Sequence, residues 1–438
     1  MSRRIAIVLF NLGGPDNLDA VRPFLFNLFA DPAIIRLPNP LRIGLAWAIA
    51  KKRSRIAKDI YAEIGGTSPL LPNTKAQARA LEAALADLGE VKAFIAMRYW
   101  HPMSQETAML VNDFAPEEVI LLPLYPQFST TTTGSSVRMW REACRIARLD
   151  VPTRLLCCYP TESRFIATMA AGLRVAHAEA AVHGRPRVLF SAHGLPEKII
   201  KAGDPYQWQC DRTSAALAAA SGIPDLDWVS THQSRVGRLK WIDPSTEAVI
   251  HEAAVAKRPI VLVPIAFVSE HSETLVELDI EYRKLADESG APCYLRVPTV
   301  GADEAFIAGL VDLVRVQHRR GTACETRGVC EAGDGGRIPG GIFGVPQRDD
   351  YRCRSNYMAR GRSARASPFL TAIQLSSRCC IAPGGTVDEV NMVVARRRWR
   401  VASDDRRPLL MQPKAGYAGL LSDAQSGFQP LDQLRRTI

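Results

Sequence analysis

Short apolar runs, each followed by a polar turn segment, recur along the first 320 residues of the chain. Runs of this kind are typical of buried strands, and stretches with the apolar spacing of helices separate them. The strand-like runs lie at 5–10, 91–96, 119–125, 187–191, 228–230 and 261–267, and two of the clearest helical patterns lie at 73–88 and 167–181. This alternation predicts an α/β fold in which helices cover both faces of parallel sheets.

Two of these runs resemble each other. Segments 121–129 and 262–269 both carry a proline inside a buried-strand pattern, and a polar turn follows each. Because proline is unfavourable in a central strand, its occurrence at the same place in both runs indicates a duplicated architecture.

The polar segments that follow the strands predict where a ligand binds. In open α/β sheets the binding crevice lies beyond the carboxyl ends of the strands. The segments in this position are 11–15, 97–102, 126–134, 192–196 and 231–234. We therefore expect the functional residues among them.

Glu273, Glu277 and Glu281 recur every four residues, so a helix would carry them as one acidic stripe without an interleaved Lys or Arg. Like charges at this spacing cost about 0.2–0.5 kcal/mol per pair. By composition alone, an exposed acidic face and a line of carboxylates facing a cavity explain the stripe equally well. His271 at the strand-to-helix junction favours the cavity, where such a line would handle protons or a divalent metal.

His193 follows a strand-like run in Ser191-Ala-His-Gly-Leu-Pro196. A histidine considered alone is more often an ordinary core or surface residue. Its place at a strand end, in a loop braced by glycine and proline, favours a functional role. A near-neutral pKa suits proton abstraction, and an imidazole nitrogen suits a borderline metal.

The hydroxyl-rich segment 127–136 is predicted to open a helix at Val137. Capping by Ser or Thr explains part of this composition. Donors at a helix N-terminus also suit an anionic substrate group such as a propionate or a phosphate, and Arg98 is a candidate partner for another carboxylate. Segments 11–15 and 64–70 match neither the dinucleotide fingerprint nor the P-loop, which disfavours a nucleotide enzyme.

Composition and charge limit the class of protein. No apolar run reaches the roughly 20 residues needed to span a bilayer, and a strand begins too early for a secretory signal, so we expect a cytoplasmic protein with reduced cysteines. Segment 321–438 holds 18 of the 55 Lys and Arg but only 11 of the 45 Asp and Glu. Most of the net charge of +10 belongs to this segment, so the charge does not argue for nucleic-acid binding.

Segment 321–438 differs in character from the rest of the chain. It contains 17 arginines, a single lysine and no sustained periodicity, with candidate strands only at 388–394 and 399–402. We expect an Arg-rich tail that is disordered or degenerate.

Six motifs, in order along residues 5 to about 315, resemble the ferrochelatase family. They are Asn11-Leu-Gly-Gly-Pro15, Met97-Arg-Tyr-Trp-His-Pro102, Tyr125-Pro-Gln-Phe-Ser129 with Thr133-Gly-Ser-Ser136, Ser191-Ala-His-Gly-Leu-Pro196, Gln233-Ser-Arg-Val-Gly237 with Leu239-Lys-Trp241, and Val268-Ser-Glu-His-Ser-Glu-Thr-Leu275 with Glu277-Leu-Asp-Ile-Glu-Tyr282. The resemblance implies two Rossmann-like halves, here 1–155 and 156–320, with a porphyrin cleft between them and a last helix able to pack back on the first half.

The resemblance also implies an activity: insertion of Fe(II) into protoporphyrin IX, with release of two protons, to give protohaem. Ferrous iron is then a substrate, and no cofactor is required. His193 and Glu273 match the family's metal-binding and catalytic pair, and Glu277 and Glu281 match an acidic line along a distorted, π-type helix. The implied porphyrin-binding residues are Leu12, Arg98, Tyr125, Ser129, Thr133, Ser135 and Ser136.

Two features depart from the family pattern. His232 stands where the family usually has an aromatic residue, which affects stacking near the cleft. Some family members bind a [2Fe–2S] cluster through cysteines near the C-terminus, but the spacings of the candidate ligands fit no cluster pattern. These candidates are Cys324, Cys330, Cys353, Cys379 and Cys380. We therefore expect no cluster.

Alternatives to this assignment stay open at the level of sequence. Insertion of Fe(II) into coproporphyrin III needs the same proton chemistry, a related chelatase would use cobalt or nickel, and a tetrapyrrole carrier would need no acidic line. Segment 24–53 is apolar with basic edges. Helical core packing explains such a pattern as well as a lip over the porphyrin that touches the inner face of a membrane. The sequence carries no signal for an oligomeric state.

Overall fold

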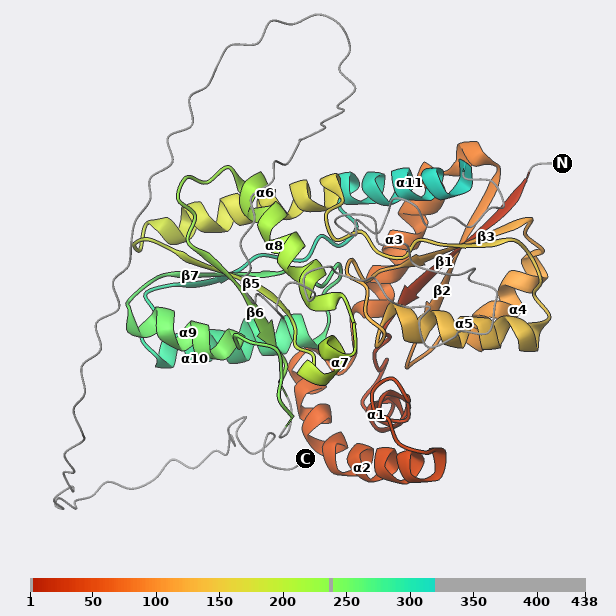
Figure 1. Ribbon diagram of the computed structural model, residues 1–438, viewed down its shortest axis with the longest axis horizontal. Helices are drawn as coiled ribbons and strands as arrows, with labels where there is room; N and C mark the ends of the chain where they lie inside the picture. Colours follow the sequence, from red (N-terminus) through yellow and green to blue (C-terminus); the bar gives the residue numbers. More distant parts are fainter. Residues whose placement is uncertain (1–2, 236–238, 320–438) are drawn as a thin grey trace, which may run out of the picture. The chain divides into compact units, whose positions relative to one another are not determined.

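Two four-stranded sheets form the frame of the structure, a computed structural model that describes residues 3–235 and 239–319 (Figure 1). All strands within each sheet run parallel. The predicted tail, its candidate strands and the five candidate cluster cysteines lie outside the described residues. Within residues 3–235 and 239–319 no disulfide joins the cysteines, which are Cys144, Cys157, Cys158, Cys210 and Cys293.

The first sheet has the strand order β2-β1-β3-β4. Its strands are β1 (Arg4–Asn11), β2 (Glu90–Met97), β3 (Glu118–Pro123) and β4 (Thr153–Leu155). The helices of this part of the chain are α1 (Val21–Phe29), α2 (Asn39–Glu63), α3 (Leu70–Ala84), a 3₁₀ turn (Ala86–Leu88), α4 (Ser104–Phe114) and α5 (Thr133–Ala147).

The second sheet has the strand order β6-β5-β7-β8. Its strands are β5 (Arg187–His193), β6 (Trp228–Gln233), β7 (Ile260–Pro264) and β8 (Tyr294–Arg296). The helices are α6 (Ser163–Ala181), α7 (Glu197–Lys201), α8 (Tyr206–Ser221), α9 (Thr246–Val255), a π-helix (Glu273–Glu281), α10 (Tyr282–Glu288) and α11 (Glu304–Arg319).

The two sheets share one topology, because the third strand in sequence pairs with the first in both of them. The two similar segments begin in β3 and β7, which occupy the same place in the two sheets. Pro123 and Pro264 are the last residues of these strands, opposite Phe10 and Ser191 respectively. A proline at the end of a strand interrupts the hydrogen-bond ladder least. The predicted α/β fold of two similar halves with parallel sheets is therefore confirmed.

One hydrophobic core extends from the first sheet to the second. It joins residues of β1 and β3 with residues of β5 and β7 through the apolar faces of α3, α6, α8 and α11. α11 packs against both α6 and α3, as Figure 1 shows. Separate cores fill the opposite faces, under α4 and α5 on the first sheet and under α9, α10 and the π-helix on the second. Both faces of the central strands are thus buried, which explains their continuous apolar runs.

Candidate active site

A cavity with mainly apolar walls lies beyond the carboxyl ends of the central strands, and residues of both halves line it. The first half contributes residues after β1, β2 and β3, from α1 and the segment that follows it, and from the start of α3. These include Leu12, Leu28, Ile34, Leu70, Tyr99, Tyr125, Ser129 and Thr132. The second half contributes residues at or after the ends of β5 and β7 and at the starts of α8 and the π-helix. These include His193, Leu195, Tyr206, Phe267, Val268, His271 and Glu273. The cavity thus lies beyond the carboxyl ends of the strands, where the sequence predicted a ligand to bind.

His193 and Glu273 meet in this cavity. His193 is the last residue of β5, and its Nδ1 lies 2.9 Å from Oε2 of Glu273, the first residue of the π-helix. The two side chains are 37% and 27% exposed, so both reach the cavity. A Cβ on Gly194 would lie 2.7 Å from the carbonyl oxygen of Gln233, so glycine is required for the chain to turn here.

The pair is electrostatically coupled. Burial alone would lower the pKa of His193, but the charge and hydrogen bond of Glu273 outweigh burial, and the pKa of His193 is raised. Burial would raise the pKa of Glu273, yet the partner imidazole reverses this and lowers it. The arrangement favours a carboxylate beside a histidine that readily takes up a proton.

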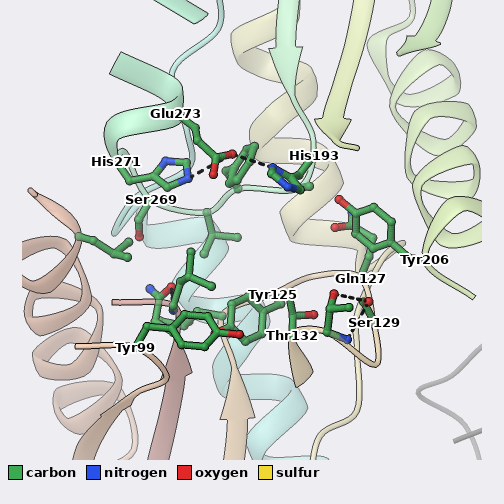
Figure 2. Close-up of a pocket in the computed structure, with 18 of the residues that line it drawn as sticks. Tyr99, Tyr125, Gln127, Ser129, Thr132, His193, Tyr206, Ser269, His271 and Glu273 are labelled. Atoms are coloured by element: carbon green, nitrogen blue, oxygen red, sulfur yellow. Dashed lines mark hydrogen bonds and ion pairs between the residues drawn. The ribbon is translucent and has the colours of Figure 1, made fainter. Parts of the chain in front are cut away.

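His271 lies on the other side of Glu273 (Figure 2). Its Nε2 is 4.0 Å from Oε2 of Glu273, and its ring packs on Phe267 with 4.5 Å between the ring centroids. Its Nδ1 has no hydrogen-bond partner, and burial lowers the pKa of the imidazole. A neutral imidazole that lines the cavity can accept a proton or donate a lone pair to a metal.

Glu277 follows Glu273 along the π-helix, and four donors surround its carboxylate. Oε1 accepts from the backbone N–H of Ser234 at 2.8 Å and from the Tyr282 hydroxyl at 2.9 Å. Oε2 accepts from the Ser234 hydroxyl at 2.5 Å and from Nε2 of Gln233 at 3.4 Å. Burial, reinforced by the charge of Glu273, nevertheless raises the pKa of Glu277.

Glu281 ends the π-helix. Burial and the charge of Glu277 raise the pKa of Glu281 to about 7. The three glutamates therefore belong to one electrostatically coupled line, and the π-type helix that the resemblance implied is present. Helices of this kind are rare and occur frequently at functional sites.

Of the seven residues predicted to bind the porphyrin, Leu12, Tyr125 and Ser129 line the cavity. The other four, Arg98, Thr133, Ser135 and Ser136, are buried and do not line it. Arg98 and Ser135 find partners inside the protein, whereas the hydroxyls of Thr133 and Ser136 are buried without a hydrogen-bond partner.

Arg98 pairs with a carboxylate of the protein itself. Its Nη2 lies 2.7 Å from Oδ2 of Asp31, and its Nε donates to the Ser135 hydroxyl at 2.7 Å. Ser135 and Tyr99 also donate to Oδ2 of Asp31, at 2.5 and 2.9 Å. The side chain of Asp31 is completely buried. This network fixes the segment between α1 and α2, which carries the cavity residue Ile34, and so Arg98 shapes the cavity indirectly.

The hydroxyl-rich loop is held in a similar way. Ser129 and Thr130 donate to Oδ2 of Asp204, with the Thr130 backbone and hydroxyl at 2.7 and 2.6 Å. The helix that follows begins at Thr133, earlier than the predicted Val137, because the Ser129 carbonyl accepts from the N–H groups of Thr132 and Gly134 and closes a turn there. Thr132 precedes the helix without a side-chain capping bond, so the capping interpretation of this composition is wrong at this residue.

His232 is buried in β6 at 2% exposure, and neither ring nitrogen has a partner at hydrogen-bond geometry. Burial is the main reason why its pKa is lowered to about 4, and the cation of Arg235 adds to the effect. The side chain does not line the cavity, so the residue affects the stability of the second sheet more directly than it affects ligand stacking.

The sequence motifs did not single out Asp31, Asp204, Tyr206 and Ser234 as site residues. Asp31 and Asp204 hold the cavity walls through partners 67 to 104 positions and 74 to 75 positions away in sequence, respectively, which no local pattern reveals. Ser234 lies within the motif Gln233-Ser-Arg-Val-Gly237, but the motif does not show that this serine contacts Glu277 in the structure.

Within residues 3–235 and 239–319, no three His, Cys, Asp or Glu side chains converge as a cage for a metal ion. His193 and Glu273 instead form an open pair. An open pair suits a metal that passes through the site as a substrate.

The comparisons with known proteins agree with this chemistry. A family model described as Ferrochelatase matches residues 4–318. A "Ferrochelatase" of Caulobacter vibrioides is 54% identical over 318 residues, covering 72% of this chain and 90% of the relative. The proteins of the same name from Pelagibacter ubique and a Wolbachia strain are each 50% identical and cover 90% and 98% of their own lengths and 70% of this chain.

Proposed function

Since this chain belongs to the ferrochelatase family, whose members are metal chelatases (lyases) that insert ferrous iron into a porphyrin in haem biosynthesis, we propose that its porphyrin substrate is protoporphyrin IX. We further propose that His193 and Glu273 carry out the exchange of protons for iron. The observation that carries this proposal is the coupled pair of His193 and Glu273 in a cavity with apolar walls.

Metallation requires removal of two pyrrole protons and of the water bound to the ferrous ion. His193, with its pKa raised by the Glu273 carboxylate, is suited to take up a pyrrole proton. The Glu273 carboxylate, which stays ionised, is suited to bind the ferrous ion as its water is lost. His271 supplies a neutral imidazole on the other side of the same carboxylate.

Protons leave, in this proposal, along the line from Glu273 through Glu277 to Glu281. The pKa is lowered at Glu273 and raised at both following glutamates, and a proton moves towards the group with the higher pKa. A carboxyl with a pKa of about 7 at the end of the line releases a proton readily at neutral pH. In this proposal iron reaches Glu273 through the cavity and does not travel along the acidic line.

Protoporphyrin IX is favoured over coproporphyrin III by the character of the cavity. Coproporphyrin III carries four carboxylates and protoporphyrin IX carries two, with apolar vinyl groups in place of the others. No Lys or Arg stands among the described residues that line the cavity, so the additional carboxylates would lose water without gaining a cationic partner.

An anaerobic assay with Fe(II) and each porphyrin in turn tests this proposal. We expect kcat/KM for protoporphyrin IX to exceed that for coproporphyrin III by about tenfold or more, because one unpaired polar group costs on the order of 1–3 kcal/mol. A preference for coproporphyrin III would contradict the substrate assignment. Porphyrin binding without metal insertion would identify a carrier instead.

We further propose that α2 contacts a membrane surface at its periphery. Exposed apolar side chains gather on this helix, with Leu41, Leu45 and Trp47 being 63%, 41% and 51% exposed. Arg22 and Lys51 lie 5.6 and 5.1 Å from the centroid of the Trp47 ring. An exposed tryptophan flanked by cations is typical of the boundary between lipid headgroups and acyl chains. Among the helices of the described residues, none is long and apolar enough to cross a bilayer.

Sedimentation with lipid vesicles tests the membrane proposal. We expect binding to vesicles that contain an anionic lipid, and an affinity about tenfold lower for a Leu41→Ser, Trp47→Ser double variant, since each change removes exposed apolar area. A Val175→Ser, Val182→Ser variant is a matched control, because these two residues of α6 and its C-terminal cap are 70% and 79% exposed. Equal binding of the two double variants would exclude α2 as the contact.

A further inference from the structure

Ser234 contacts two carboxylates of the acidic line at once. Its hydroxyl lies 2.5 Å from Oε2 of Glu277 and 3.4 Å from Oε2 of Glu273, and its backbone N–H donates to Oε1 of Glu277 at 2.8 Å. Ser234 follows β6 directly, so it joins the end of a strand to the π-helix.

The backbone of Ser234 is left-handed, with φ at 59°. A residue with a Cβ is strained in this conformation, whereas glycine adopts it freely. The conformation allows the N–H and the hydroxyl of one residue to reach the same carboxylate. An observed strain of this kind at a functional site points to a function for the side chain.

The other contacts of Glu277 show what the hydroxyl contributes. Oε1 has a second short donor in Tyr282, but the other donor to Oε2 is Gln233, at 3.4 Å. Gln233 is itself held by Ser191, whose hydroxyl donates to its Oε1 at 2.8 Å. Without the Ser234 hydroxyl, Oε2 would keep a single long contact while the charge of Glu273 repels it.

We propose that Ser234 is a positioning residue of the chelation reaction, whose hydroxyl holds the Glu277 carboxylate next to Glu273 and so keeps the acidic line continuous. This inference rests on the proposed function of that line. Ser234 acts through Glu277 and does not need to touch the porphyrin or the iron.

Substitutions at Ser234 separate this role from a contribution to folding. Ser234→Gly removes the hydroxyl, keeps the N–H donor and relieves the left-handed strain, so we expect a Tm within about 3 °C of wild type. We expect kcat to fall about tenfold with the porphyrin KM unchanged, which is the effect of losing a hydrogen bond to a charged group. Ser234→Ala, which also lacks the hydroxyl, should show the same loss of kcat.

Ser234→Thr is the matched variant that keeps the hydroxyl. A β-branched residue is more strained at positive φ, so we expect a lower Tm than that of Ser234→Gly but a kcat within about twofold of wild type. Ser234→Gly would then have the higher Tm of the two variants, and Ser234→Thr would have the higher kcat. Activity that follows Tm across the three variants, or a kcat of Ser234→Gly equal to that of wild type, would overturn the proposal.

Glu277→Gln distinguishes failure of this inference from failure of the proposed function. Slow turnover in Glu277→Gln together with normal turnover in Ser234→Gly would remove the role of Ser234 and leave the acidic line intact. Unchanged kinetics in Glu277→Gln would remove the line itself, and the role of Ser234 with it.

Discussion

Replacing His193 with alanine is expected to lower kcat for iron insertion by about 10²–10⁴-fold while porphyrin binding persists. His193 has a raised pKa because Glu273 lies 2.9 Å away, so the variant loses the group best suited to take up a pyrrole proton. The 37% exposure of the side chain indicates that its loss leaves no cavity in the hydrophobic core. We therefore expect a Tm near that of wild type.

Anaerobic initial rates, porphyrin binding followed by fluorescence quenching, and thermal unfolding check this prediction together. His251→Ala is the matched control, since His251 is an exposed histidine on α9 outside the cavity lining. It should keep the wild-type rate. Wild-type activity in His193→Ala would show that another group takes up the pyrrole proton, and His271 would be the next candidate.

Replacing His232 with phenylalanine is expected to stabilise the protein increasingly as the pH falls. The pKa of His232 is about 4 in the folded protein, against 6.5 for the ordinary side chain. The unfolded chain therefore binds a proton between these values when the folded protein does not, and wild type loses stability as the pH falls from about 6.5 to about 4. The full loss is about 3 kcal/mol, and it levels off below the folded pKa.

Urea unfolding of wild type and His232→Phe at several pH values between 4 and 7.5 measures this effect. Other groups titrate in both proteins, so their contributions cancel in the difference of the free energies of unfolding. His232→Gln is the control for packing, because it also cannot titrate in this range but is not apolar. We expect a pH-independent difference between the two variants. A pH-independent difference between wild type and both variants would show that His232 does not titrate as inferred.

Local patterns predicted the architecture and the edge of the sheets at which the cavity lies. The alternating apolar runs predicted parallel sheets, and the two prolines that indicated duplication lie at equivalent strand ends, Pro123 and Pro264. The pairing of His193 with Glu273 came from the resemblance to the ferrochelatase family, and the two side chains lie 2.9 Å apart in the structure. The location of the cavity could be predicted because strand ends converge at one edge of a parallel sheet whatever the details of packing.

Contacts that depend on long-range packing were not predictable. Arg98 suggested a substrate carboxylate, but it pairs with Asp31, a partner 67 positions away. A buried cationic side chain must pair with a carboxylate, and the spacing of residues in the sequence does not show which carboxylate lies next to it in the fold. The strained backbone of Ser234 was hidden for the same reason, since its conformation depends on contact with the π-helix. The bounds predicted for the two halves and the roles of the site residues stay predictions.

The hydrophobic core that extends from one sheet to the other has a consequence for how the active site is lost on unfolding. Neither half encloses its own inner face, because α3, α6, α8 and α11 close a single core with residues from both sheets. Loss of either sheet would expose a large apolar surface of the other. His193 and Glu273 both belong to the second half, but the cavity that holds them is lined by both halves, so separating the two sheets would remove one wall of the site and leave the pair without its enclosure.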